Sequence, residues 1–206
     1  MLAYKNYFWD FDGTLYDTYP EMVASFAAAL AQKNFKADRD AIYHQMRWHS
    51  LGWTVKYYSQ KFGLDPADLR KAYDAIEAHK FDSAESFPYA DAVCSAVRNQ
   101  GGRNFLLTHR DKRAIDLLER DGLKADFSGF VTGNDDFPRK PDPASLLYLC
   151  RKYAVDPAQS AMVGDRKLDV AAGHNAGMAG ILFDADSLIE DTGNPDQRIV
   201  SLKELL

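Results

Sequence analysis

The sequence predicts an α/β fold: a parallel sheet with helices on both faces and an all-helical domain inserted after the first strand. Three features of the sequence predict it. An aromatic-rich apolar run lies near the N-terminus, a strand-poor block with helical periodicity follows, and beyond residue 87 short apolar runs alternate with helical segments. Such alternation is typical of parallel sheets, because a helix usually connects one parallel strand to the next.

The composition is that of a globular protein of ordinary size. The chain has 206 residues, of which 46% are apolar and 27% charged, enough for a full core without disulfides. A net charge of −5 provides no basic surface, so we expect neither nucleic acid nor a membrane as partner. The short apolar runs do not resemble a secretory signal or a membrane span, and Cys94 and Cys150 show no metal-ligand spacing. We therefore expect a cytoplasmic protein with free thiols.

The first element is a strand at 4–9, rich in the aromatic residues that favour buried strands. Between 19 and 79, apolar residues recur every three or four positions in separate segments, which indicates four helices. The fourth begins at Asp65 and Pro66, a typical N-cap and first-turn pair. We therefore expect a helical cap at 16–83 and a core formed by 1–15 and 84–206.

The rest of the core alternates helices and strands after Pro88. Helices are predicted at 91–99, 112–120, 143–153 and 168–175. Strands are predicted at 104–108, 129–132, 160–164 and 180–183. Glycines after 99 and near 122 end two of the helices, and Pro143 begins a third. The tail after Asp184 shows no interpretable motif.

Polar residues follow the predicted strands where each strand ends. In open parallel sheets, ligands bind beyond the carboxyl ends of the strands. The residues at these ends, or in the loop next to them, are Asp10, Asp12, Thr108, His109, Arg110, Lys140, Asp165 and Asp169. We expect this set to converge at one edge of the sheet.

The converging groups suit phosphoryl transfer. Asp10, Asp12 and Asp165 offer the hard oxygen ligands that Mg²⁺ prefers, and such an ion also neutralises a phosphate brought near carboxylates. One carboxylate can form an aspartyl-phosphate, while a second protonates the leaving alcohol and then activates water. Thr108 and Lys140 would bind the remaining phosphoryl oxygens.

Four short motifs resemble those of the haloacid dehalogenase-like hydrolase superfamily and occur in the same order: DFDGT, LLTHR, RKPDP and VGDRKLD. The layout of the motifs and of the helical block resembles the phosphoglycolate phosphatase-like subgroup. The resemblance implies a Rossmann-like core, a helical cap after the first strand and Mg²⁺-dependent phosphoryl transfer. It implies that Asp10 is the nucleophile and a metal ligand. It further implies that Asp12 is the general acid and base with its carbonyl on the metal, and that Asp165 is the remaining protein ligand.

The resemblance also implies roles around the phosphoryl group. Thr108 and Lys140 would hold it. Asp169 would support the metal or Lys140 from the layer of residues around the direct ligands. His109 either binds phosphate as well or packs beside the site, and packing is the favoured interpretation. Arg110 either pairs with Asp12 or Asp111 or reaches the substrate, and the structural role is favoured.

One segment of the helical block combines cations with tryptophans. Arg47, His49 and Lys56 lie around Gly52 between two predicted helices. A lid that closes over a site needs a flexible point and groups that read the substrate, so these cations are candidate contacts for an anionic leaving group. The alternative is that the segment serves packing alone.

We interpret the chain as an Mg²⁺-dependent phosphatase of a small phosphorylated metabolite, similar to phosphoglycolate or a sugar phosphate. A β-phosphoglucomutase-like mutase would need the same Asp10 and Asp12, and a non-catalytic phospho-ligand sensor would use the same fold. A phosphonatase would need a cap lysine, for which Lys56 is the candidate. Asp12 argues against dehalogenation, because those members lack this second aspartate. The oligomeric state and the exact substrate are not specified by the motifs.

Overall fold

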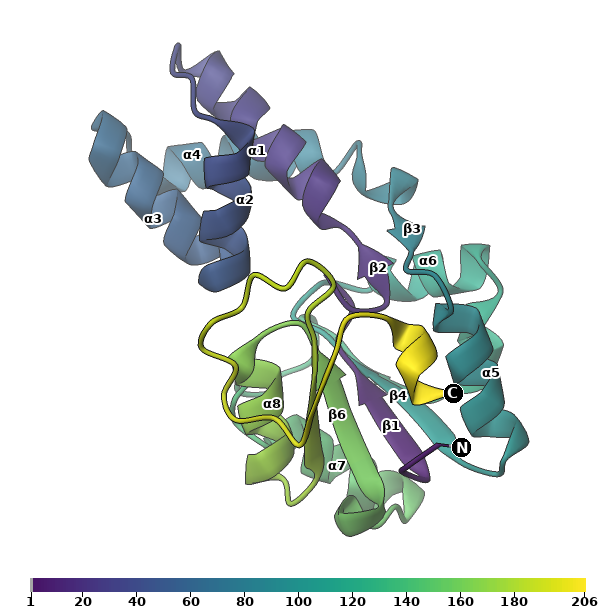
Figure 1. Ribbon diagram of the computed structural model, residues 1–206. Coiled ribbons are helices and arrows are strands. Elements are labelled where there is room, and N and C mark those ends of the chain that lie inside the picture. Colours follow the sequence, from purple (N-terminus) through teal and green to yellow (C-terminus); the bar gives the residue numbers. More distant parts are fainter. Residues whose placement is uncertain (1) are drawn as a thin grey trace. The chain divides into compact units, whose positions relative to one another are not determined.

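The computed structural model describes residues 2–206, which divide into two compact units. One unit combines the chain up to Tyr16 with Ser86–Leu206, and the other is Asp17–Glu85. The chain passes from one unit to the other at β2 (Tyr16–Asp17) and returns at β3 (Glu85–Ser86). These two short strands pair with each other as a two-stranded sheet (Figure 1).

The larger unit is built on a six-stranded sheet in the order β5-β4-β1-β6-β7-β8, with parallel pairing throughout. The strands are β1 (Asn6–Trp9), β4 (Arg103–Leu107), β5 (Phe127–Val131), β6 (Ser160–Gly164), β7 (Ala179–Phe183) and β8 (Gln197–Ile199). The helices are α5 (Ala90–Asn99), α6 (Arg113–Arg120), α7 (Ala144–Tyr153) and α8 (Lys167–Asn175). The predicted strands and helices of this unit are present, with ends that shift by at most two residues.

Helices cover both faces of this sheet, as predicted. Phe8 of β1 contributes to an apolar cluster that α7 and α8 complete, with Leu146, Leu149, Ala172 and Ala176 among its members. Trp9, the next residue, points to the opposite face, because neighbouring side chains of a strand alternate. There its indole Nε1 donates to Asn104 Oδ1 at 2.9 Å, and Asn104 Nδ2 donates to the carbonyl of Cys94 in α5 at 2.8 Å.

Strand β1 lies at the centre of the sheet between β4 and β6 (Figure 1). Its four residues are fully buried, and the backbone N–H of Asp10 still donates to the carbonyl of Val163 in β6, at 2.9 Å. The sheet therefore fixes the start of the turn that carries Asp10.

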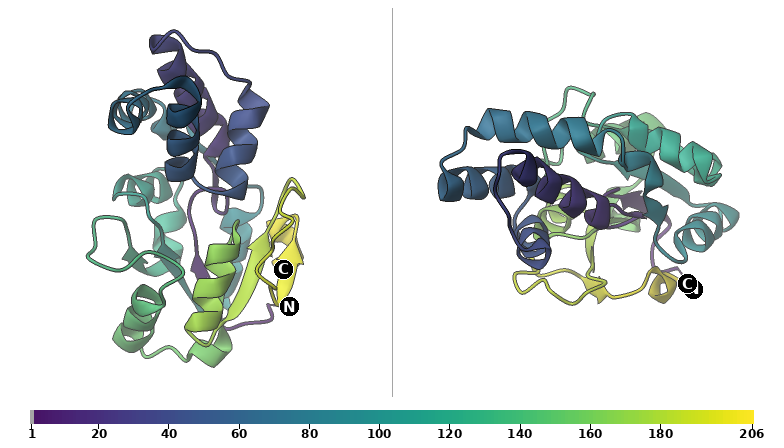
Figure 2. Two further views of the ribbon diagram at one scale, coloured as in Figure 1. Left: turned by 90° about the vertical axis from the view of Figure 1, so that its left-hand side faces the viewer. Right: turned by 90° about the horizontal axis from the view of Figure 1, so that it is seen from above.

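The smaller unit consists of the four predicted helices, α1 (Tyr19–Gln32), α2 (Arg39–Trp48), α3 (Leu51–Phe62) and α4 (Pro66–Glu77) (Figure 2). Asp38, Ser50 and Asp65 cap the last three through side-chain oxygens that accept backbone N–H groups. The unit has its own apolar core, in which Phe26 of α1 contacts the rings of Tyr58 and Tyr73.

The tail after Asp184 adds elements that the sequence did not reveal. It forms edge strand β8 and a short 3₁₀ helix, η4 (Leu202–Leu205). Other 3₁₀ turns are η1 (Phe81–Ser83), η2 (Leu123–Asp126) and η3 (Pro157–Gln159). Within residues 2–206, no helix combines the length and the apolar character needed to cross a membrane.

Candidate active site

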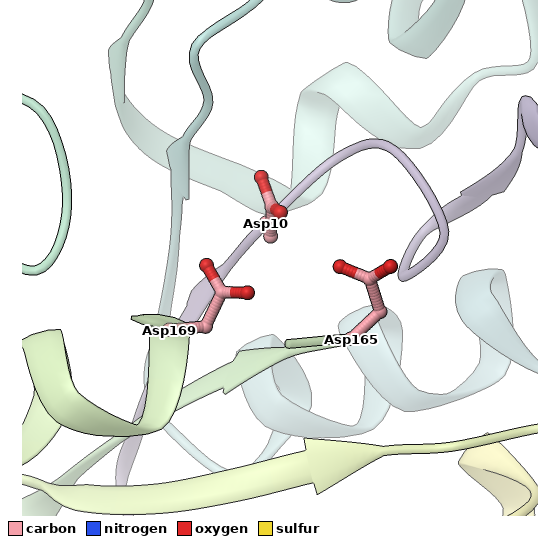
Figure 3. Close-up of side chains that lie close together, drawn as sticks. All are labelled: Asp10, Asp165 and Asp169. Atoms are coloured by element: carbon pink, nitrogen blue, oxygen red, sulfur yellow. The ribbon is translucent and has the colours of Figure 1, made fainter. Parts of the chain in front are cut away.

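Three buried carboxylates meet at the carboxyl edge of the central strands. Asp10 follows β1, Asp165 follows β6, and Asp169 lies in the first turn of α8. One oxygen from each lies within 4.8 Å of the others, and the side chains point toward one another (Figure 3). The convergence that the sequence predicted for Asp10 and Asp165 is therefore present, and Asp169 belongs to the same cluster.

Two cations lie beside this cluster: Arg166 Nε is 3.7 Å from Asp165 Oδ1, and Lys140 is buried against the other two carboxylates. Its Nζ lies 2.9 Å from Asp10 Oδ1 and 2.6 Å from Asp169 Oδ1, and it donates to the carbonyl of Leu107 at 3.3 Å. The three charged side chains are almost wholly shielded from water. Burial alone would lower the pKa of Lys140, but the two carboxylates raise it above its ordinary value. Lys140 therefore stays charged and links the loop after β5 to the ends of β1 and α8.

The three carboxylates carry more negative charge than Lys140 and Arg166 together neutralise. Burial raises the pKa of Asp10 to about 6, with Lys140 opposing the rise and Asp169 adding to it. Carboxylate oxygens this close together are the donor set of a hard divalent cation such as Mg²⁺. The residues present therefore fit Mg²⁺.

Gly164 allows Asp169 to reach the cluster. A Cβ at Gly164 would lie 2.2 Å from Asp169 Cβ and Cγ, a distance that excludes any side chain there. Asp169 is also held by its Oδ2, which accepts the backbone N–H of Arg166 at 3.2 Å. The spacing of the aspartates alone did not signal this requirement for glycine.

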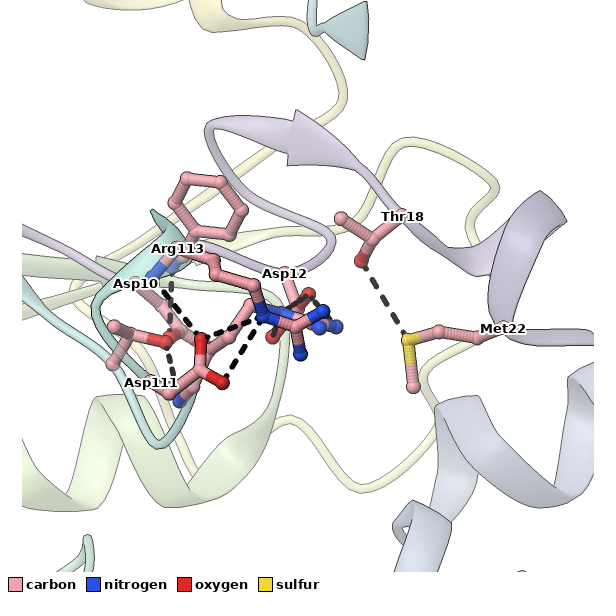
Figure 4. Close-up of polar contacts among 9 residues, drawn as sticks. Asp10, Asp12, Thr18, Met22, Asp111 and Arg113 are labelled. Carbon is pink, nitrogen blue, oxygen red and sulfur yellow. Dashed lines mark hydrogen bonds and ion pairs between the residues drawn. The ribbon is translucent and has the colours of Figure 1, made fainter. Parts of the chain in front are cut away.

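Asp12 lies in the turn after Asp10 (Figure 4) and its side chain is about one-quarter exposed. Gly13 permits that turn with a φ of 71°, a conformation that favours glycine, and its N–H donates to the carbonyl of Tyr16 at 2.8 Å. The Asp12 carboxylate accepts hydrogen bonds from Arg110, at 2.9 and 3.1 Å from Nε and 2.7 Å from Nη2. Of the partners that the sequence left open for Arg110, the structure has Asp12.

Thr108 and His109 follow β4, and each bonds to a neighbouring loop. Thr108 is buried and its Oγ1 accepts the N–H of Arg110 at 3.0 Å, so its own hydrogen is available to an acceptor in the site. His109 Nε2 accepts the backbone N–H of Lys140 at 3.1 Å. Burial lowers the pKa of His109 to about 3, with Lys140 adding to the effect. A neutral His109 thus orients the Lys140 loop.

The three candidate cations of the helical unit differ in their surroundings. Arg47 is buried and lies over the ring of Tyr19, 5.4 Å from its centroid. His49 stacks on Trp53 with ring centroids 4.1 Å apart, and Lys56 is exposed. Within this unit, Arg47 is therefore buried in a packing contact, whereas His49 and Lys56 are both exposed.

Comparison with known proteins shows similarity in sequence and in fold. Residues 4–177 match the family model of the haloacid dehalogenase-like hydrolases. Phosphoglycolate phosphatases are among the similar proteins. That of Psychrobacter arcticus is 30% identical, and the match covers 82% of this chain and 78% of the relative. That of Vibrio cholerae is 28% identical, and the match covers 86% of this chain and 83% of the relative. The crystal structure of a hydrolase from Streptococcus pneumoniae is 31% identical, with a TM-score of 0.68 over 88% of this chain and 94% of its own. A HAD family hydrolase from Deinococcus radiodurans shares the fold, with a TM-score of 0.79 at 17% identity over 100% and 94%.

Proposed function

We propose a substrate class and a mechanism for this chain, which belongs to the haloacid dehalogenase-like hydrolases and is a phosphoric monoester hydrolase of that family. It hydrolyses a small phosphorylated metabolite, uses Mg²⁺ and forms an aspartyl-phosphate on Asp10. The observation that carries the proposal is the buried cluster of Asp10, Asp165 and Asp169, in which Lys140 pairs with Asp10 and Asp169. The names of the similar proteins favour a phosphoglycolate-like substrate, and a sugar phosphate is the next class to test.

We assign separate roles to the two units. The larger unit holds every candidate catalytic residue and would be the catalytic core. The smaller unit, Asp17–Glu85, would be the cap that selects the substrate, since Arg47, His49 and Lys56 all belong to it. Of these three, His49 and Lys56 are exposed and therefore accessible to an anionic group, whereas Arg47 is buried.

Asp10, Asp165 and the backbone carbonyl of Asp12 would hold Mg²⁺, with Asp169 beside them. When bound, Mg²⁺ supplies positive charge that lets a phosphate dianion approach these carboxylates. The exclusively oxygen donor set is the reason for assigning Mg²⁺ rather than a softer metal.

Each chain residue then has a defined task. An Asp10 oxygen attacks phosphorus as the bond from phosphorus to the leaving oxygen breaks, and Asp12 gives that oxygen a proton. Asp12 then takes a proton from the water that attacks phosphorus, which releases inorganic phosphate and restores the Asp10 carboxylate. Throughout, the Thr108 hydroxyl donates to a phosphoryl oxygen, and Lys140 balances its charge.

The test is phosphate release from 2-phosphoglycolate, a panel of sugar phosphates and p-nitrophenyl phosphate, with and without Mg²⁺. Asp10→Asn should abolish release, because an amide cannot form the aspartyl-phosphate. Asp191→Asn is the matched control, since Asp191 is an exposed carboxylate that pairs with Lys167 at the surface, and it should retain activity.

The other possible outcomes contradict the proposal in recognisable ways. Phosphate that stays on the sugar and changes position would indicate a mutase. Binding of phosphate esters without turnover would indicate a phospho-ligand sensor. Release that survives Asp10→Asn would refute the role of Asp10.

A further inference from the structure

We propose that Arg110 is a positioning residue that holds the Asp12 carboxylate in place for proton transfer. The inference rests on the proposed function, in which Asp12 is the acid and base. Its structural basis is the bidentate pair: Arg110 Nε lies 2.9 Å from Asp12 Oδ1 and 3.1 Å from Oδ2, and Nη2 lies 2.7 Å from Oδ1. The Arg110 side chain is 10% exposed, so water competes little for the pair.

The backbone of Arg110 is anchored as firmly as its side chain. Its N–H donates to Thr108 Oγ1 at 3.0 Å, and its carbonyl accepts the N–H of Gly133 at 2.6 Å. A Cβ at Gly133 would lie 2.4 Å from the carbonyl oxygen of His109 and 3.2 Å from that of Arg110. Arg110 thus connects the hydroxyl proposed to bind phosphate with the carboxylate proposed to move the proton.

Asp12 needs such a partner because its side chain is partly exposed. Its backbone lies in a glycine-containing turn, where it forms an isolated bridge with Tyr16. The backbone is thus placed by the turn, whereas the position of the carboxylate depends on its side-chain contacts. A misplaced proton donor costs rate steeply, because proton transfer requires hydrogen-bond contact in the transition state. The planar guanidinium, with its fixed fork of donors, can define both the position and the plane of a carboxylate.

Arg110 bonds to both oxygens of Asp12, from Nε to each of them and from Nη2 to Oδ1. These bonds hold the plane of the carboxylate while it gives a proton to the leaving alkoxide and the bond from Asp10 to phosphorus forms. The same carboxylate takes a proton back from water in the second half of the reaction.

Two ester substrates distinguish a role of Arg110 in positioning Asp12 from a role in binding the phosphate. An alkyl ester such as 2-phosphoglycolate needs a proton on its leaving oxygen, whereas p-nitrophenolate leaves as a stable anion. Loss of Arg110 should therefore slow the alkyl ester much more than the first release of p-nitrophenolate. A residue that bound the phosphate itself would affect both esters equally.

The experiment compares Arg110→Met, Arg110→Lys and Arg113→Met in the full chain with Mg²⁺. Arg113 is the matched control, because it pairs with Asp111 (Figure 4) and is 36% exposed. Stopped-flow measures the p-nitrophenolate burst, and phosphate release gives kcat and KM for 2-phosphoglycolate. We expect Arg110→Met to lower kcat for the alkyl ester by about tenfold or more. The burst rate should change by less than about threefold and KM should stay nearly constant.

The remaining variants test whether the loss of kcat arises from the pair between Arg110 and Asp12. Arg110→Lys should recover part of the lost kcat, and Arg113→Met should resemble the wild type. With Asp12 already changed to Asn, adding Arg110→Met should cause no further loss, because the group it positions is gone. The retained p-nitrophenolate burst also shows that the variants are folded.

Two outcomes overturn the inference alone: equal losses for both esters in Arg110→Met, or a rise in KM with kcat unchanged. Wild-type protein that hydrolyses neither ester refutes the proposed function, and the inference falls with it. If the wild type hydrolyses the esters and Arg110→Met leaves the ratio of its rates on the two esters unchanged, only the role of Arg110 is refuted.

Discussion

Replacement of Lys140 by methionine should destabilise the larger unit even without metal. Methionine keeps the apolar stem but removes the ammonium, which lies 2.9 Å from Asp10 and 2.6 Å from Asp169. Removing one partner from a buried ion pair costs about 3–5 kcal/mol, because the other partner stays buried and uncompensated.

Protonation of Asp10 limits the loss in this variant. Burial already raises the pKa of Asp10 to about 6, and loss of the nearby Lys140 raises that pKa further. We therefore expect a loss of about 3 kcal/mol in the free energy of unfolding at pH 7.5, at the lower end of the range. A raised carboxyl pKa favours the folded state at low pH. The penalty should thus shrink by up to about 1.4 kcal/mol per pH unit as the pH falls from the variant's Asp10 pKa to about 6.

The assay is urea denaturation in EDTA, followed by tryptophan fluorescence. Trp9 belongs to the larger unit, and the other two tryptophans, Trp48 and Trp53, belong to the smaller one. Changing both of these to phenylalanine leaves Trp9 as a reporter of the larger unit alone. Mg²⁺ should stabilise the variant, because it supplies some of the missing positive charge.

Lys167→Met is the control for the Lys140 variant. Lys167 pairs with Asp191, and both side chains are more than half exposed, so its loss should cost less than about 1 kcal/mol. A Lys140→Met variant that loses no more stability than this control at pH 7.5 would refute the argument from buried charge. A penalty that grows as the pH falls would refute the assigned role of Asp10.

Three further predictions concern the sheet and the thiols. Gly164→Ala should weaken Mg²⁺ binding at least tenfold by calorimetry, about 1.4 kcal/mol, because the new methyl group displaces Asp169; unchanged affinity would contradict this. Asn104→Leu should cost roughly 2–4 kcal/mol in urea denaturation, because it leaves the buried indole of Trp9 without its acceptor and removes a donor to two carbonyls; a stable variant would show that the network is dispensable. Iodoacetamide at pH 8 should label Cys94 and Cys150 only after unfolding, since burial raises the pKa of both thiols; mass spectrometry that finds rapid labelling of the native protein would be inconsistent with their burial.

The parts of the fold that the sequence predicted share a local signal. Asp10, Thr108 and Asp165 each follow an apolar run, and parallel strands place such residues at one edge without any knowledge of strand order. The order itself depends on long-range pairing: Asn6 of β1 lies opposite Arg103 on one side and Ser160 on the other. Strand β8 was missed because its three residues are too few for a two-residue period to stand out.

The finer geometry of the site depends on contacts that no local pattern encodes. Asp169 joins the cluster because Gly164 has no side chain, a condition set by the packing of α8 on β6. Arg110 had Asp12, Asp111 and the substrate as possible partners, and the folded loop decides for Asp12. In both cases tertiary packing settles a contact that the sequence left open. The substrate contact expected of Arg47 stays a prediction, and its side chain lies over the ring of Tyr19.

The pairing of β2 with β3 has a consequence for engineering and for evolution. Paired strands lie about 5 Å apart, so the two crossing points of the inserted unit are close neighbours. A turn of a few residues between Asp17 and Glu85 could replace the whole helical insertion without stretching the chain. The insertion is thus an exchangeable module: a minimal version of the larger unit could be expressed without it, and a different helical module could be grafted onto the same two strands.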